Sequence, residues 1–202
     1  MRLVAVGAGA ITAAALAVAL GVALLLALLG GTAFDLAGAA GDADIDGLAA
    51  AAPFTGAGGG CTVDDPTTRG CLTPATHHVL DSVFATFGPP GGVLLSATCW
   101  DPHLQNPSSD HPKGRACDLF PTRAGTFPAG DDLAHGWQIA NWLRANAAPL
   151  QIKYLIWQGR YWDPSTNDRD GAWGVPYTGG GIYDPTDATG GHFDHVHVSV
   201  ER

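Results

Sequence analysis

The stretch His195-Val196-His197-Val198-Ser199-Val200 alternates polar and apolar side chains beside the C-terminus. Successive side chains of a β-strand point to opposite faces of its sheet. We therefore expect the valines on the core face of a closing strand, and His195, His197 and Ser199 together on the other face. Alone, this pattern fits a solvated edge strand as well as part of a metal site. The choice between the two depends on whether other metal-binding residues lie elsewhere in the chain.

Candidate partners lie upstream, in the stretch SSDHPKGRACDLF (108–120). His111 and Asp118 both carry side chains that bind zinc well. Gly114 is expected to let the chain turn after His111, and Ala116 to leave room beside Asp118 on one face of a short strand. Cys117 then points to the other face.

The pattern of apolar residues predicts an α+β domain. A helix is expected from the Thr73-Pro74 pair to Gly88, because proline suits the first helical position. A second helix is expected over 131–147, and strands over 93–100, 115–120, 152–158 and 195–200. Residues 159–191, rich in Gly, Pro, Asp and Tyr, are expected to form a long functional loop. These elements fit a small antiparallel sheet with two main helices.

The N-terminal part predicts export. Residues 3–29 carry no charge and are long enough to span a bilayer as a helix. We expect residues 1–32 to be a signal anchor that leaves the C-terminal domain extracellular. A cleaved signal peptide is the alternative, with Ala37-Gly38-Ala39 as its processing site and a secreted product. Residues 33–60 are expected to be a flexible spacer, and residues 61–202 the folded domain.

Charge and cysteine content narrow the function. The net charge of −9 and the lack of a basic block exclude a nucleic-acid surface. The four cysteines of an exported chain predict two disulfides, although free thiols are an alternative. Proximity in the sequence favours pairing Cys61 with Cys71 and Cys99 with Cys117 among three connectivities.

The segment Ser109–Asp118 resembles the first metal motif of the zinc D-alanyl-D-alanine peptidases of the VanY type. The segment GHFDHVHV (191–198) resembles the closing motif of the related murein endopeptidases. Together with the helix end WLRANA (142–147), the resemblance covers about residues 92–200 and is closest to exported actinobacterial cell-wall domains. It implies the fold shared by the D-Ala-D-Ala peptidases and the Hedgehog signalling domain.

The resemblance also implies roles for single residues. His111, Asp118 and His197 would bind Zn²⁺ and leave a fourth position for water, as in catalytic zinc sites. Ser109 would contribute to substrate binding. The only glutamate of the chain is Glu201, so the general base of the carboxypeptidases, a glutamate three residues before the last ligand, is missing.

The base must then come from the histidine-rich end. We favour His195, which shares a strand face with His197; His192 is the second candidate, and Asp194 either acts itself or orients a histidine. His103 is a minor candidate for the site. The aromatic residues of the long loop would line a groove or form a small core of their own, namely Tyr161, Trp162, Trp173, Tyr177 and Tyr183.

The sequence thus predicts an exported zinc metallopeptidase, a hydrolase of peptidoglycan stem peptides or cross-links. Its partners would be peptidoglycan and, through the N-terminal helix, the cell membrane. The alternative is a non-catalytic module that binds the cell wall, which the missing glutamate supports.

Overall fold

A computed structural model describes residues 45–165 and 173–201 of the chain. The predicted signal anchor (1–32) and much of the predicted spacer lie outside these residues. The described residues all belong to one compact unit. Among the described residues, no helix has the length and apolar character that crossing a membrane requires.

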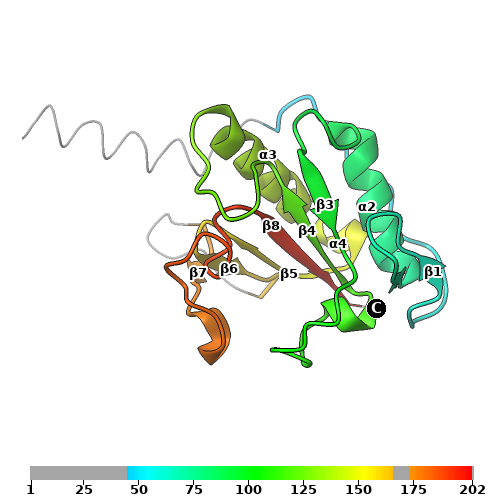
Figure 1. Cartoon of the computed structure of the whole chain (residues 1–202). Coiled ribbons are helices and arrows are strands. Elements are labelled where there is room, and N and C mark those ends of the chain that lie inside the picture. Colours follow the sequence, from blue (N-terminus) through cyan, green and yellow to red (C-terminus); the bar gives the residue numbers. More distant parts are fainter. Residues whose placement is uncertain (1–44, 166–172, 202) are drawn as a thin grey trace, which may run out of the picture. The chain divides into compact units, whose positions relative to one another are not determined.

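A six-stranded antiparallel sheet forms the centre of the domain (Figure 1). The last strand of the chain, over residues 196–200, lies between two other strands of this sheet, and all neighbouring strands are antiparallel. Across the sheet, the strands are β3 (Ser96–Thr98), β4 (Ala116–Phe120), β8 (Val196–Val200), β5 (Ile152–Trp157), β6 (Arg160–Trp162) and β7 (Val175–Pro176).

The apolar face of this sheet is covered by helices (Figure 1). Helix α2 (Pro74–Phe87) contacts β4 and β8, while α3 (Asp131–Ala145) contacts β5 and β8; the short α4 (Ala147–Leu150) follows α3. The three valines of β8 are fully buried. The other face of β8 is also buried, with His197 at 5% exposure and Ser199 at 0%. The closing strand is therefore central, and its histidines are enclosed.

The α+β class, the antiparallel sheet and both long helices agree with the prediction from sequence. Thr73 caps α2 by accepting a hydrogen bond from the Thr76 backbone N–H, and Gly88 ends the helix. The strand expected over 93–100 is shorter, since only Ser96–Thr98 pair with β4.

The prediction of one long loop over 159–191 is wrong in part, because two strands of the sheet lie within this range. Gln158 and Gly159, with φ of 51° and 65°, form the two-residue turn between β5 and β6. Such turns match the twist of antiparallel strands. Arg160 and Tyr161 then pair with β7. The two short strands were not predicted because the residues of this range are typical of turns.

A second small sheet pairs β1 (Val63–Asp64) with β2 (Cys71–Leu72). Both expected disulfides are present, Cys61–Cys71 beside this hairpin and Cys99–Cys117 between the β3 end and β4. The described residues before Cys61 contact the domain: the Trp142 indole N–H donates to the Ala49 carbonyl, and the Phe54 N–H to the Pro149 carbonyl.

Candidate metal centre

His111, Asp118 and His197 converge from three elements: the 3₁₀ helix η1 (His111–Lys113), β4 and β8. His111 Nε2 lies 3.3 Å from His197 Nδ1 and 3.3 Å from Asp118 Oδ1. His197 Nδ1 lies 2.9 Å from the same oxygen. A triangle with these sides has a circumscribed radius of about 1.8 Å, so one point can lie about 2.1 Å from all three atoms, the distance that zinc requires.

Both histidines present the correct nitrogen for a metal. The Nδ1 of His111 hydrogen-bonds the Cys99 backbone carbonyl, which leaves Nε2 free to face Asp118. The Nε2 of His197 lies 3.0 Å from the Ser199 hydroxyl, which leaves Nδ1 facing the same point. Metal-binding histidines usually have their second nitrogen held in this way. The donor set therefore fits Zn²⁺.

The loop before β4 is built to hold His111. Gly114 ends η1 in the left-handed region, with φ of 64°, where glycine is favoured. A Cβ there would lie 2.4 Å from the Cys71 carbonyl oxygen. Asp110 is buried and binds Lys153, Arg115 and Lys113 at 2.8, 3.0 and 3.5 Å. This ionic cluster fixes the backbone next to His111.

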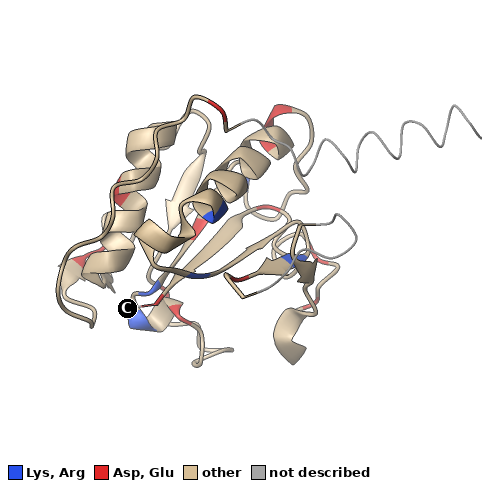
Figure 2. Cartoon of the chain, turned by 180° about the vertical axis from the view of Figure 1, so that it is seen from behind, with Lys and Arg blue, Asp and Glu red and all other residues tan. Residues whose placement is uncertain are grey.

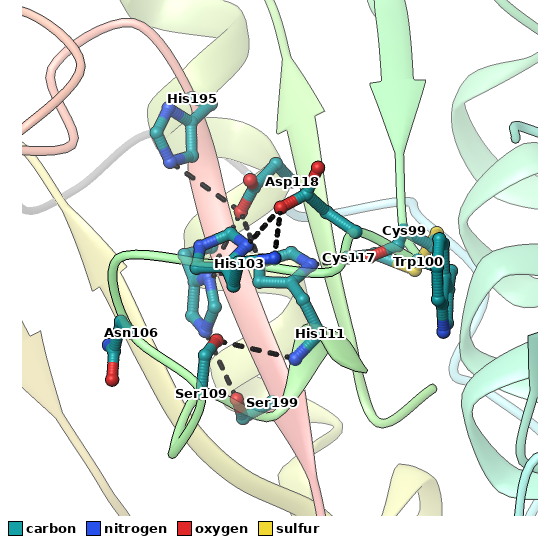
Figure 3. A network of polar contacts seen from close by, with 12 residues as sticks. Cys99, Trp100, His103, Asn106, Ser109, His111, Cys117, Asp118, His195 and Ser199 are labelled. Atoms are coloured by element: carbon teal, nitrogen blue, oxygen red, sulfur yellow. Dashed lines mark hydrogen bonds and ion pairs between the residues drawn. A yellow bond between two sulfur atoms is a disulfide. The ribbon is translucent and has the colours of Figure 1, made fainter. Parts of the chain in front are cut away.

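His195 and Asp194 form a second pair beside the three converging residues. Asp194 is fully buried, and its Oδ1 lies 2.5 Å from His195 Nδ1. Its Oδ2 accepts from the Gly125 N–H at 2.6 Å and from the Thr189 hydroxyl at 2.7 Å. The opposite nitrogen of His195 points at Asp118, 3.5 Å from Oδ1 (Figure 3). Asp194 therefore orients His195.

His192 also lies in the site, next to the rings of His195 and His197, 4.7 and 5.5 Å away between centroids. Its backbone is left-handed, with φ of 57°, and its buried Nδ1 has no hydrogen-bond partner among the described residues. Burial, followed by the nearby His195, lowers the pKa of His192 well below its ordinary value. His192 is therefore neutral.

The carboxylates next to His195 and His111 raise the pKa values of both histidines. Burial lowers the pKa of His195, but the carboxylates of Asp118 and Asp194 outweigh this effect and raise it. Burial likewise opposes protonation of His111, yet Asp118 raises its pKa to about 9. Metal binding at His111 would thus displace a proton.

A cavity of about 350 Å³ opens above these residues. One wall comes from the loop between β3 and η1, the other from residues 177–192, and the Asn106 amide contacts the Tyr183 hydroxyl at 3.3 Å. Ser109, predicted to bind substrate, lines the cavity and accepts a hydrogen bond from the His111 N–H at 3.3 Å.

His103 lines the cavity too, as the minor hypothesis from the sequence proposed. Its ring stacks on His111 with centroids 4.7 Å apart, and its Nδ1 lies 2.6 Å from Asp101 Oδ1. This second Asp–His pair was missed in the sequence, although a spacing of two residues was a usable signal. The roles of Gly125 and Thr189 had no such signal, because only folding brings them to Asp194.

The aromatic residues between 159 and 191 were predicted either to line a groove or to form a small core, and the structure shows both. Tyr177 and Tyr183 line the cavity, whereas Trp162 and Trp173 are buried. Tyr161 stacks on Tyr154, which lies in the cavity wall.

Comparison with known proteins adds one match. A family model described as "VldE, C-terminal domain" matches residues 68–189, more than half of the chain. The matched span includes His103, His111 and Asp118 and ends before His192. No curated protein and no solved structure matches the chain significantly.

Proposed function

The chain belongs to the VldE C-terminal domain family, and we propose that it is an exported, zinc-dependent peptidase that hydrolyses peptidoglycan stem peptides or cross-links. The observation that carries the proposal is the convergence of His111, Asp118 and His197 beside the Asp194–His195 pair, at the floor of one cavity. Three protein ligands with an open fourth position are typical of catalytic zinc. The resemblance to the D-Ala-D-Ala peptidases and murein endopeptidases supplies the substrate class and the finer fold assignment.

In this mechanism each residue has a separate task. Zinc bound to the three ligands would polarise the scissile carbonyl and make water more acidic. His195 accepts a proton from the attacking water at the nitrogen that faces Asp118, and returns it to the amine nitrogen as the C–N bond breaks. Asp194 holds the opposite nitrogen protonated and fixes the ring. His195 therefore replaces the missing glutamate.

His192 has a supporting role in this proposal. Its neutral ring fills the wall beside His195 and His197, and its Nδ1, to which no described residue hydrogen-bonds, is available for substrate. Export agrees with the two disulfides, which persist in oxidising compartments. We propose a membrane anchor at residues 1–32, or secretion after cleavage, on the sequence pattern alone.

The experiment uses the full chain, purified in mild detergent because of its apolar N-terminal stretch. Bound metal is measured by mass spectrometry, and purified peptidoglycan is digested with and without chelator. We expect stoichiometric zinc and released muropeptides, and a loss of at least about a hundredfold in activity for His111→Ala. His77→Ala is the matched control, because His77 lies on the surface of α2 and pairs with Asp81.

If the chain holds no zinc and His111→Ala changes nothing, the proposal is wrong. If zinc binds and the chain sediments with insoluble peptidoglycan but releases no fragments, the domain is the non-catalytic wall-binding module instead.

A further inference from the structure

The disulfide between Cys99 and Cys117 lies next to the candidate metal centre, and both cysteines are buried. The Cys99 backbone carbonyl accepts the hydrogen bond from His111 Nδ1, so Nε2 keeps the lone pair that a metal needs. Cys117 directly precedes Asp118 on β4. One covalent bond therefore joins the group that orients a converging histidine to the strand that carries the converging carboxylate (Figure 3).

The sheet itself does not reach Cys99. The pairing of β3 with β4 ends one residue earlier, at Thr98 opposite Asp118, and residues 101–109 form no helix or strand. The Cys99 N–H donates to the Thr67 hydroxyl at 3.0 Å, which holds the peptide from the side of the β1–β2 hairpin. The disulfide adds a covalent bond to β4 at the same point, where the chain leaves the sheet.

The disulfide also closes the loop that contains His111. Cys99 and Cys117 are 18 positions apart, and closing a loop restricts the conformations that the chain would otherwise sample. On β4, Asp118 stands directly opposite His197 of β8. The three converging residues therefore belong to one cross-linked unit.

The backbone of His111 is held by other contacts. Asp110 forms ion pairs beside it, where acidic and basic segments lie close together at η1 (Figure 2), and Gly114 ends this helix. The His111 ring, by contrast, is oriented by the Cys99 carbonyl and by stacking on His103. Loss of the disulfide should therefore loosen the ring and leave η1 in place.

From this arrangement we infer that Cys99 and Cys117 are positioning residues of the metal centre, which gains its full zinc affinity only when the two cysteines are oxidised to the disulfide. The inference rests on the proposed zinc-dependent function and adds a condition for assembly of that site. In the oxidation step, thiol–disulfide exchange with a partner disulfide forms the Cys99–Cys117 bond, and the partner leaves as two thiols that carry the two electrons and the two protons. Because the cytosol keeps thiols reduced, an exported chain would complete the site after export.

The test measures zinc affinity, which a loss of stability alone would not change in the folded protein. The Kd for Zn²⁺ is determined by competition with a chromophoric chelator, on the full native chain and on the double variant Cys99→Ala/Cys117→Ala. Alanine is chosen because free thiolates bind zinc themselves. Outer-shell partners of metal ligands contribute about 10–100-fold to metal affinity, so we expect the Kd of the double variant to be at least about tenfold higher.

The matched control is Cys61→Ala/Cys71→Ala, which removes the disulfide beside the β1–β2 hairpin. In the described part of the chain, this pair makes no hydrogen bond to the three converging residues. We expect a lower unfolding midpoint in both double variants, but a change in zinc Kd below about threefold in the control. Circular dichroism verifies that each variant is folded.

If the folded Cys99→Ala/Cys117→Ala variant keeps a zinc Kd within about twofold of the native value, the inference is wrong and the metal centre stands. An equal loss of affinity in the control would also overturn the inference, because the effect would then be one of general stability. If the oxidised native chain binds no zinc, the inference and the proposed zinc-dependent function both fail. Should the double alanine variant not fold, Cys99→Ala/Cys117→Val restores part of the lost side-chain volume and takes its place in the same comparison.

Discussion

The substitution Asp194→Asn tests the proposed base most directly. In the native chain, one carboxylate oxygen faces His195 Nδ1 at 2.5 Å, and the other accepts from the Gly125 N–H and the Thr189 hydroxyl. Asparagine has only one acceptor oxygen, and the Gly125 N–H can only donate. The amide oxygen must therefore face Gly125, so that the NH₂ group faces His195.

That orientation reverses the tautomer of His195. Its Nδ1 would have to accept a hydrogen bond, which places the proton on the nitrogen that faces Asp118 and removes the basic lone pair from the site. Removing a correctly oriented base costs about 10²–10⁴ in kcat, which is about 3–5 kcal/mol of transition-state stabilisation. The lost charge-assisted hydrogen bonds should also lower the free energy of unfolding by about 1–3 kcal/mol.

The assay measures kcat and KM on a cross-linked muropeptide, with bound zinc and the unfolding midpoint recorded for each variant. We expect kcat to fall while zinc stays stoichiometric, because Asp194 is not among the three converging ligands. Asp184→Asn is the matched control, on an exposed carboxylate that does not line the cavity and accepts hydrogen bonds from the Thr186 N–H and hydroxyl. If Asp194→Asn keeps kcat within about twofold of the native chain, with zinc bound, His195 is not a base oriented by Asp194.

Two further predictions concern the stability contributed by Gly114 and Asp65. In a urea titration, Gly114→Ala should lower the free energy of unfolding by about 2–4 kcal/mol, since its Cβ would meet the Cys71 carbonyl oxygen at 2.4 Å. The control Gly180→Ala, with a similar φ of 60° and open space around it, should lower the free energy of unfolding by only about 1 kcal/mol. Burial raises the pKa of Asp65, but hydrogen bonds from Thr68, Trp100 and Thr67 outweigh it and hold the pKa below its ordinary 3.8. A carboxylate with a lowered folded-state pKa stabilises the fold above pH 3.8, and this contribution is lost as the pH falls through the folded-state pKa. Asp65→Asn should therefore be less stable than the native chain by about 1–3 kcal/mol at pH 7. At pH 3 the two proteins should differ less in free energy of unfolding, as measured by chemical unfolding at both pH values.

Short-range patterns explain why much of the fold was predictable. The Thr73 cap, the apolar period of α2 and the alternation of 195–200 are local signals, and each produced its element. Proximity likewise favoured both disulfides. The two short strands β6 and β7 were missed because their residues resemble a loop, and only pairing within the sheet stabilises them, β6 with β5 and β7 with β6.

The sequence by itself determined which residue types could bind a metal and on which strand face they stand, because side-chain direction in a strand follows from the backbone. Tertiary structure alone decided which of those residues meet. His111 and His197 are separated by 86 positions, yet their ring nitrogens lie 3.3 Å apart. Gly125 and Asp194 are 69 positions apart and share a hydrogen bond. Such contacts depend on how strands and loops pack, which no local pattern records, and they assign Asp194 to orienting His195.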